Sequence, residues 1–383
     1  MLKVAGTMGR MLKRLVAGAA GAAGALCLAG CGGPTIGIPS PSAGPPRGDT
    51  PAADLRAQIT LLYGERTYVL GKLVVAGSAG RKDEYSSYAR LLATNAGDLG
   101  DALSKAAGQG TGDSFQQARL LGDGFFVDYM VGVTTQQQPM ADIALQNLNT
   151  KYVPDMVQVL SSALNISNST ATKLLTDEVT SSKQFIDDGA AGTPTPFYSD
   201  LRSAYATSMS MGSAVAEAVA AKFPDKYPGD PASAGAKLRA QFDSLFQEHS
   251  YLATMATAAA ASNDQNGKTA ASGALGANTD ALAQLFASTY DHATGDDARK
   301  AWTDENTALL GYAVTPDASP SATELSDFFA GLHASGDIPA QIQATVMVID
   351  DQRAKSYDKI AEEDRYASTL LVAVGDGLLS SAQ

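Results

Sequence analysis

The feature that most constrains the fold is a spacing of apolar residues that α-helices explain. After residue 53, Leu55, Ile59, Leu62, Val69 and Leu73 recur at steps of three, four or seven positions. This spacing places them on one face of a helix. Clusters of Gly, Pro, Asn and Ser separate such segments, and no segment sustains the alternation of a half-buried strand. The sequence therefore predicts an all-α fold.

Similar apolar stripes continue along the chain, and each predicts one buried helix face. The stripes are Leu91-Leu92-Leu99-Leu103, Leu121-Phe125-Tyr129, Val157-Leu160-Leu164, Leu174-Leu175-Phe185-Ile186 and Leu201-Tyr205-Val215-Val219. Because clusters of Gly, Pro, Asn and Ser separate these stripes, we expect several helices.

An internal repeat is the second constraint. Leu55-Arg56-Ala57-Gln58 returns as Leu238-Arg239-Ala240-Gln241, at an offset of 183 positions (238 − 55). The same offset relates residues over three predicted helices, including Leu62 and Leu245, Glu65 and Glu248, Tyr68 and Tyr251, Asn95 and Asn278, and Tyr129 and Tyr312. Farther along, Ile186-Asp187-Asp188 matches Ile349-Asp350-Asp351 at an offset of 163 (349 − 186), so the second copy lacks 20 residues (183 − 163) near its fourth helix. We predict two homologous helical bundles of about five or six helices each, produced by internal duplication.

The boundary between the two bundles is marked by prolines. Three of them fall within residues 223–231, where they end one helix before the next begins. We assign residues 54–228 to the first bundle and residues 233–383 to the second.

The first thirty residues have the composition of a signal peptide. Lys3, Arg10, Lys13 and Arg14 precede a segment from Leu15 to Gly30 that carries no charge. This segment is short and rich in Ala and Gly, and a membrane-spanning helix needs about 20 strongly apolar residues. We therefore expect residues 1–30 to be removed during export.

The end of this leader, Leu28-Ala29-Gly30-Cys31, resembles the lipobox of bacterial lipoproteins. The resemblance implies that Cys31 is diacylated (a palmitate-type modification) and becomes the N-terminus, which places the protein on the outer face of the cell membrane. Two acyl chains anchor a protein stably, whereas one chain binds only marginally. An ordinary secretory signal, which would leave a secreted protein, is the alternative. Residues 31–53, rich in Pro, Gly and Ser, are expected to form a tether.

The net charge limits the classes of partner, and the cysteine content limits the disulfides that can form. The four basic residues of the leader take the formal net charge from −12 to −16 when they are removed. A chain this acidic is not expected to bind nucleic acid or anionic headgroups through bulk charge. Its two cysteines are Cys27, in the leader, and Cys31, at the lipidation site. The helical part therefore folds without a disulfide.

Two polar residues interrupt the apolar face of the first helix in each copy. Glu248 and His249 stand there in the second copy, and Glu65 and Arg66 stand at the matching positions. A buried charge is costly unless it is paired, so each glutamate should have a partner. Glu305 lies on an apolar face two helices later, so a divalent-metal site at Glu248, His249 and Glu305 is one hypothesis. The alternative is a set of structural ion pairs.

The chain carries no Gly-x-Ser-x-Gly elbow, P-loop or dinucleotide fingerprint, and no cysteine nucleophile after the lipidation site. We therefore expect a non-enzymatic protein. The duplicated bundles resemble helical-bundle proteins that bacteria export. The sequence favours an anchored surface lipoprotein that binds a small ligand or a protein partner, with metal binding or storage as the alternative.

Overall fold

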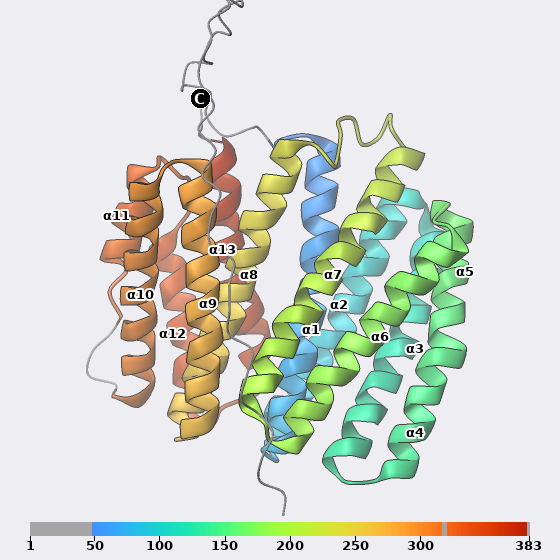
Figure 1. The fold of residues 1–383 in the computed structure, drawn as a ribbon, viewed down its shortest axis with the longest axis horizontal. Helices are drawn as coiled ribbons and strands as arrows, with labels where there is room; N and C mark the ends of the chain where they lie inside the picture. Colours follow the sequence, from blue (N-terminus) through green and yellow to red (C-terminus); the bar gives the residue numbers. More distant parts are fainter. Residues whose placement is uncertain (1–47, 316–319, 381–383) are drawn as a thin grey trace, which may run out of the picture. The chain divides into compact units, whose positions relative to one another are not determined.

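Helices account for every regular element that the structure describes, and the all-α prediction is confirmed (Figure 1). The computed structural model describes residues 48–315 and 320–380. The predicted signal peptide, Cys31 and most of the predicted tether lie outside the described residues. No helix within the described ranges is both long enough and apolar enough to cross a membrane.

The N-terminal half of the described chain begins at residue 51 and ends at residue 222. Its elements are α1 (Pro51–Ser78), α2 (Lys82–Ala107), α3 (Gln109–Thr134), α4 (Gln138–Asn147), a π-helical segment η1 (Leu148–Tyr152), α5 (Val153–Leu164), α6 (Asn168–Ala191) and α7 (Pro194–Lys222).

The C-terminal half has a similar order of long helices with one shorter section. Its elements are α8 (Ala234–Ala261), α9 (Gln265–Thr289), α10 (His292–Val314), α11 (Thr323–Gly331), α12 (Ile338–Ala354) and α13 (Ile360–Ser380). Where the N-terminal half has α4, η1 and α5, this half has α11 between α10 and α12. The shorter section lies where the sequence comparison places the 20 missing residues.

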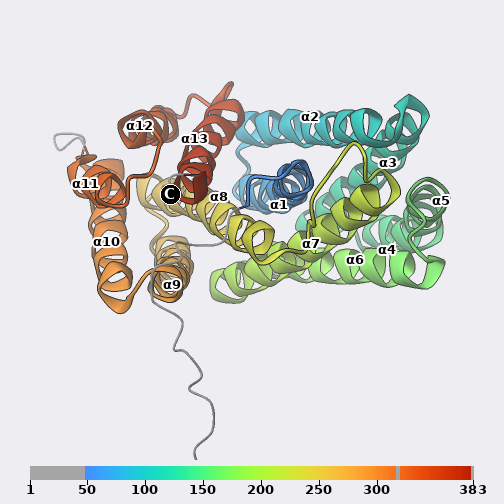
Figure 2. The same ribbon diagram turned by 90° about the horizontal axis from the view of Figure 1, so that it is seen from above.

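Helices α1 and α8 lie at the centre of the described helices and pack against each other (Figure 2). Each also packs against the helix that follows it and against the last helix of its own half, which is α7 for α1 and α13 for α8. Contacts of α7 with α9 and of α13 with α2 join the halves on either side of this central pair. The two halves therefore share an extended interface.

The start of α1 differs from the predicted end of the tether. Residues up to 53 were assigned to the tether, but α1 begins at Pro51. Thr50 caps this helix, since its hydroxyl accepts a hydrogen bond from the backbone N–H of Ala53 at 3.2 Å. Proline suits the first helical position because its missing N–H would have no partner there. A proline counted as a tether residue is thus part of the helix start.

The proline-rich boundary between the halves is not helical. It runs over residues 223–233, between the end of α7 and the start of α8. Ser233 caps α8 by accepting a hydrogen bond from the N–H of Ala236 at 3.2 Å. The chain thus leaves one half and enters the other through a short connection.

Two apolar clusters fill the interior. The larger cluster includes buried side chains from both halves, among them Tyr68 and Tyr251. The second cluster belongs to the C-terminal half, and we call it the aromatic cluster because the rings of Phe246, Phe286 and Trp302 pack together in it among aliphatic side chains. Because the larger cluster crosses from one half to the other, separating the halves would expose apolar surface to water.

The buried face of α3 is rotated from the predicted one. Leu121 is 40% exposed and Phe125 is only half-buried, whereas Phe115 and Phe126 are fully buried. Gly122 lies four residues before Phe126, one helical turn away. Because Gly122 has no side chain, the ring of Tyr152 packs against the helix backbone there. The predicted Leu121-Phe125-Tyr129 stripe is therefore wrong at Leu121, and Phe125 lies at the edge of the buried face, because Gly122 makes a close contact that the spacing of large apolar residues does not reveal.

Candidate functional site

Glu248 lies in the middle of α8 and faces the N-terminal half. Its carboxylate accepts two hydrogen bonds from Arg202 of α7, from Nε and Nη2, each at 3.1 Å. It also accepts from the hydroxyl of Tyr68 at 3.1 Å and from the amide of Asn278 at 2.8 Å. The expectation that a buried glutamate at this position has a partner is confirmed.

Glu65 of α1 is bound in the same way, with the halves exchanged. Its carboxylate accepts from Arg365 Nε at 2.8 Å and from the hydroxyl of Tyr251 at 3.1 Å. The amide of Asn95 donates at 2.7 Å. Each glutamate is thus held by an asparagine of its own half and by an arginine and a tyrosine of the other half. The rings of Tyr68 and Tyr251 stack between the two sets, 5.5 Å apart and nearly parallel.

The charges of this central network are fixed by its own electrostatics. Burial, together with the neighbouring glutamate, raises the pKa of Tyr68 and of Tyr251 well above the ordinary value. Both phenols keep their protons and act as donors. Burial alone would lower the pKa of Arg365, but Glu65 raises it, and the net shift is upward. Tyr68, Tyr251 and Arg365 therefore remain hydrogen-bond donors to the two glutamates.

His249 points away from Glu248 and into the aromatic cluster of the C-terminal half. Its ring lies 4.2 Å from that of Trp302, and its Nε2 lies 3.7 Å from Oε2 of Glu305. Its Nδ1 lies 3.0 Å from Oδ1 of Asn278. The amide nitrogen of Asn278 already donates to Glu248 and to the carbonyl of Leu245, so Oδ1 accepts and Nδ1 carries a proton. Among the described residues, neither Nε2 nor either oxygen of Glu305 has a hydrogen-bond partner.

The structure therefore brings together two of the three residues of the metal hypothesis. His249 and Glu305 face each other, whereas the carboxylate of Glu248 is bound by four donors from other residues. Two side chains are one fewer than the three protein ligands of a typical catalytic zinc site. Within the described ranges, no group of three or more His, Cys, Asp or Glu side chains is placed to hold a metal ion.

A second set of buried charges lies in the N-terminal half and was missed by the sequence analysis. Glu178 of α6 accepts from Arg66 at 2.8 Å, from Arg119 at 2.6 Å and from the hydroxyl of Tyr152 at 2.7 Å. Arg66 also binds Asp123, four residues after Arg119 on α3. The signal was present in the sequence, because Glu178 follows the buried Leu175 by three positions on the apolar stripe of α6.

Helix α7 faces α8 along a line that we call the seam. A cavity of about 350 Å³, here called the junction cavity, lies on the seam where the end of α1 and the start of α7 meet the end of α8. Its apolar wall includes Pro194, Phe197 and Met255. Cavities of this size hold small molecules in other proteins. Both halves contribute to it, as a ligand site between them requires.

Tyr198 provides an unused polar group at the junction cavity. The residue lines the cavity and is only 5% exposed, and its hydroxyl makes no hydrogen bond with the described residues. The charged groups nearby are engaged, since Arg81 binds Glu84 and Asp264 caps α9 by accepting from the N–H of Gly267 at 2.9 Å. Burial, with Asp264, raises the pKa of Tyr198 above its ordinary value. The phenol thus stays protonated and can donate a hydrogen bond to a ligand.

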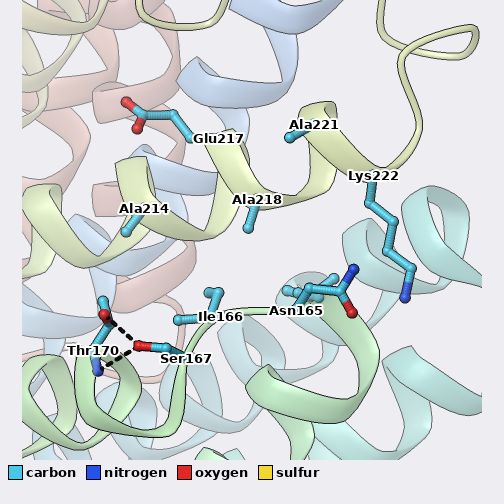
Figure 3. A pocket seen from close by; sticks show the side chains of 10 residues that line it. Asn165, Ile166, Ser167, Thr170, Ala214, Glu217, Ala218, Ala221 and Lys222 are labelled. Atoms are coloured by element: carbon cyan, nitrogen blue, oxygen red, sulfur yellow. Dashed lines mark hydrogen bonds between the residues drawn. The ribbon is translucent and has the colours of Figure 1, made fainter.

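A hollow of about 410 Å³ in the N-terminal half has less to offer a ligand (Figure 3). Its two charged residues are engaged elsewhere, because Glu217 pairs with Arg56 and Lys222 donates to the carbonyl of Ala163. Figure 3 shows Glu217 pointing away from Ile166 and Asn165. The junction cavity is the better candidate because it has an unused donor and walls from both halves.

Comparison of the chain with protein-family models, with curated proteins and with solved structures found no match. The functional argument therefore depends on the residues and on their geometry.

Proposed function

We propose that this protein is a lipid-anchored lipoprotein on the outer face of a bacterial cell membrane, with a non-enzymatic role in binding a small ligand. The observation that carries the binding role is the junction cavity, which has apolar walls and an unpartnered tyrosine hydroxyl. The anchor is supported by the sequence Leu28-Ala29-Gly30-Cys31 after a positively charged, then uncharged, leader. The ion pairs of Glu65, Glu178 and Glu248 with arginines support a structural role for these residues.

We also propose that the two halves arose by internal duplication. Contacts at matched positions support this origin. Asn95 and Asn278 donate to Glu65 and Glu248, and Tyr129 donates to Asp187 at 2.6 Å as Tyr312 donates to Asp350 at 2.8 Å. The first three of these residue pairs lie 183 positions apart and Asp187 and Asp350 lie 163 apart, as in the sequence repeat. Such agreement extends the repeat from residue types to their contacts.

The anchor is tested by replacing the residue that would carry the lipid. In cells of a lipoprotein-producing bacterium, we expect the wild-type chain in the membrane fraction, released by detergent. Cys31→Ala should appear in the soluble fraction or the medium, because a chain without acyl groups has no stable hold on the bilayer. Membrane retention of Cys31→Ala at the wild-type level would contradict the anchor.

The binding role is tested by filling the junction cavity. Anilinonaphthalenesulfonate is a suitable fluorescent probe, since its aromatic body matches the apolar wall and its sulfonate can accept from Tyr198. Ala259 lines the cavity, and Ala259→Trp should weaken binding of this probe by about tenfold or more, equivalent to about 1.4 kcal/mol. Ala93→Trp, at an exposed position of α2 away from the cavity, is the matched control. Equal binding by both variants would reject the cavity as the ligand site.

A further inference from the structure

The two buried glutamate–arginine pairs differ in one respect. Arg365 donates to Glu65 and, through Nη2, to a second carboxylate, that of Asp98. Arg202 donates to Glu248 and, among the described residues, to no second carboxylate. Arg202, which faces the seam, therefore lacks the second carboxylate partner that Arg365 has in Asp98.

The missing partner can be traced to one position. Asp98 lies three residues after Asn95 on α2, and Ala281 lies three residues after Asn278 on α9. The two asparagines hold the two glutamates in the same way. Residues three apart lie on one helix face, so Ala281 stands on α9 where Asp98 stands on α2. A methyl group replaces a carboxylate there, and both residues are half-buried.

Space is present beside Arg202. Its side chain is 27% exposed and lines a cavity of about 560 Å³ on the seam, here called the arginine cavity, with Tyr205, Met209 and Leu245. Ala281 lines a neighbouring hollow that shares Ser244 and Leu245 with the arginine cavity. The position that matches Asp98 therefore lies at a hollow next to the arginine cavity.

Arg202 also supplies an unused charged donor to this cavity. Its Nε and Nη2 groups bind Glu248, whereas Nη1 has no hydrogen-bond partner among the described residues. The hydroxyls of Tyr205 and Ser203 are taken, since Tyr205 donates to the carbonyl of Ser244 at 2.7 Å and Ser203 donates to that of Ser199 at 3.0 Å. Burial alone would lower the pKa of Arg202, but Glu248 raises it, so the guanidinium stays charged.

We propose that Arg202 binds the carboxylate of a small monoanionic acid in the arginine cavity. A guanidinium that already binds one carboxylate can donate to a second one, as Arg365 does to Asp98 through Nη2 within this molecule. One negative charge suits the site, because Glu248 already neutralises part of the guanidinium and repels a dianion such as phosphate. Met209 and Leu245 provide apolar walls for a short aliphatic tail. Butyrate has this chemistry and serves as the probe.

The test measures butyrate binding to the full-length protein in detergent by saturation-transfer NMR and calorimetry, at constant ionic strength. Butyramide, the uncharged analogue, is the control ligand. Ala281→Asp puts a carboxylate at the place of Asp98 and should weaken butyrate binding by about tenfold or more. Ala281→Asn has the same shape without the charge and should bind butyrate within about twofold of wild type. Ala259→Trp leaves butyrate binding unchanged, which separates this site from the junction cavity.

A second variant tests the proposal at the matching arginine, Arg365. Asp98→Ala removes the second partner of Arg365 and should create an additional butyrate site, seen as a doubled stoichiometry. The proposal is overturned if wild-type protein binds butyrate no better than butyramide. It is also overturned if Ala281→Asp, shown to be folded by circular dichroism, binds butyrate as tightly as Ala281→Asn.

Discussion

Replacing Lys72 with methionine lowers the free energy of unfolding by about 3–5 kcal/mol. The ammonium group of Lys72 on α1 lies 2.5 Å from Oδ2 of Asp364 on α13, and both side chains are at most 5% exposed. Lys72→Met leaves the charge of Asp364 buried without its counter-ion. The hydroxyls of Tyr88 and Thr254 still donate to that carboxylate, but hydrogen bonds alone do not neutralise it.

The matched double variant distinguishes loss of the pair from loss of packing. In Lys72→Met with Asp364→Asn, no charge remains at this pair. The asparagine carbonyl can accept from one of the two hydroxyls, and its NH2 group can donate to the oxygen of the other, because Tyr88 and Thr254 bind different oxygens of Asp364. We expect the double variant to recover most of the lost stability, because the desolvation cost of both ions disappears together. The chain itself has a methionine, Met255, at the position that matches Lys72.

Urea denaturation of the purified protein, followed by circular dichroism, measures these free energies. A loss below about 1 kcal/mol for Lys72→Met, the value of an exposed ion pair, would mean that this pair does not join the halves as described. A double variant as unstable as the single one would point to packing of the lysine chain rather than to its charge.

Replacing Glu178 with glutamine has a comparable effect in the N-terminal half, about 3–5 kcal/mol near neutral pH. Glu178 is the shared acceptor of Arg66 and Arg119, which are both at most 1% exposed. Glutamine keeps the shape but leaves two buried guanidinium groups with only Asp123 as a counter-charge. The amide of glutamine would also place its own N–H donors against the groups of Arg66, Arg119 and Tyr152 that donate to Glu178.

The effect of Glu178→Gln should depend on pH. Burial alone would raise the pKa of Glu178, but Arg119 and Arg66 lower it, and the net shift is downward. A carboxyl with a lowered folded-state pKa stabilises the fold above its unfolded-state pKa, about 4.3 for glutamate. This contribution is lost as the pH falls through the folded-state value. The difference between wild type and variant should therefore be largest at neutral pH and shrink below about pH 4.

Asp177→Asn is the control for this prediction, because Asp177 precedes Glu178 on α6 and forms an exposed pair with Lys173. Its loss should change the free energy of unfolding by less than about 1 kcal/mol. Urea titrations of the three proteins at several pH values make the comparison. A difference between wild type and Glu178→Gln that stays constant down to pH 3 would contradict the ion-pair assignment.

The sequence was informative where one periodic pattern determines one structural feature. Apolar spacing predicted helices, and every regular element among the described residues is a helix. The costs of burying charge predicted a partner for Glu248, and Arg202 provides it. The start of α1 and the buried face of α3 were missed by a few residues, because a capping threonine and a small glycine act through contacts that spacing does not encode.

The sequence could not identify which groups meet across helices. Glu248 and His249 are neighbours in the chain, yet successive residues of a helix point about 100° apart, so one faces α7 and the other faces the aromatic cluster. Their proposed convergence with Glu305 therefore failed at Glu248. The sequence analysis missed the cluster around Glu178 because its members come from three helices and from η1, which are far apart in the chain.

The sequence by itself determined the helices, the repeat and the requirement that Glu65 and Glu248 be paired, because periodicity and desolvation act along a single element. Only the tertiary structure decided that each glutamate is held by the opposite half and that Arg202 has a vacant position where Arg365 has Asp98. Those facts depend on how α7 and α13 lie against α9 and α2, and packing between distant segments has no local signature in the chain.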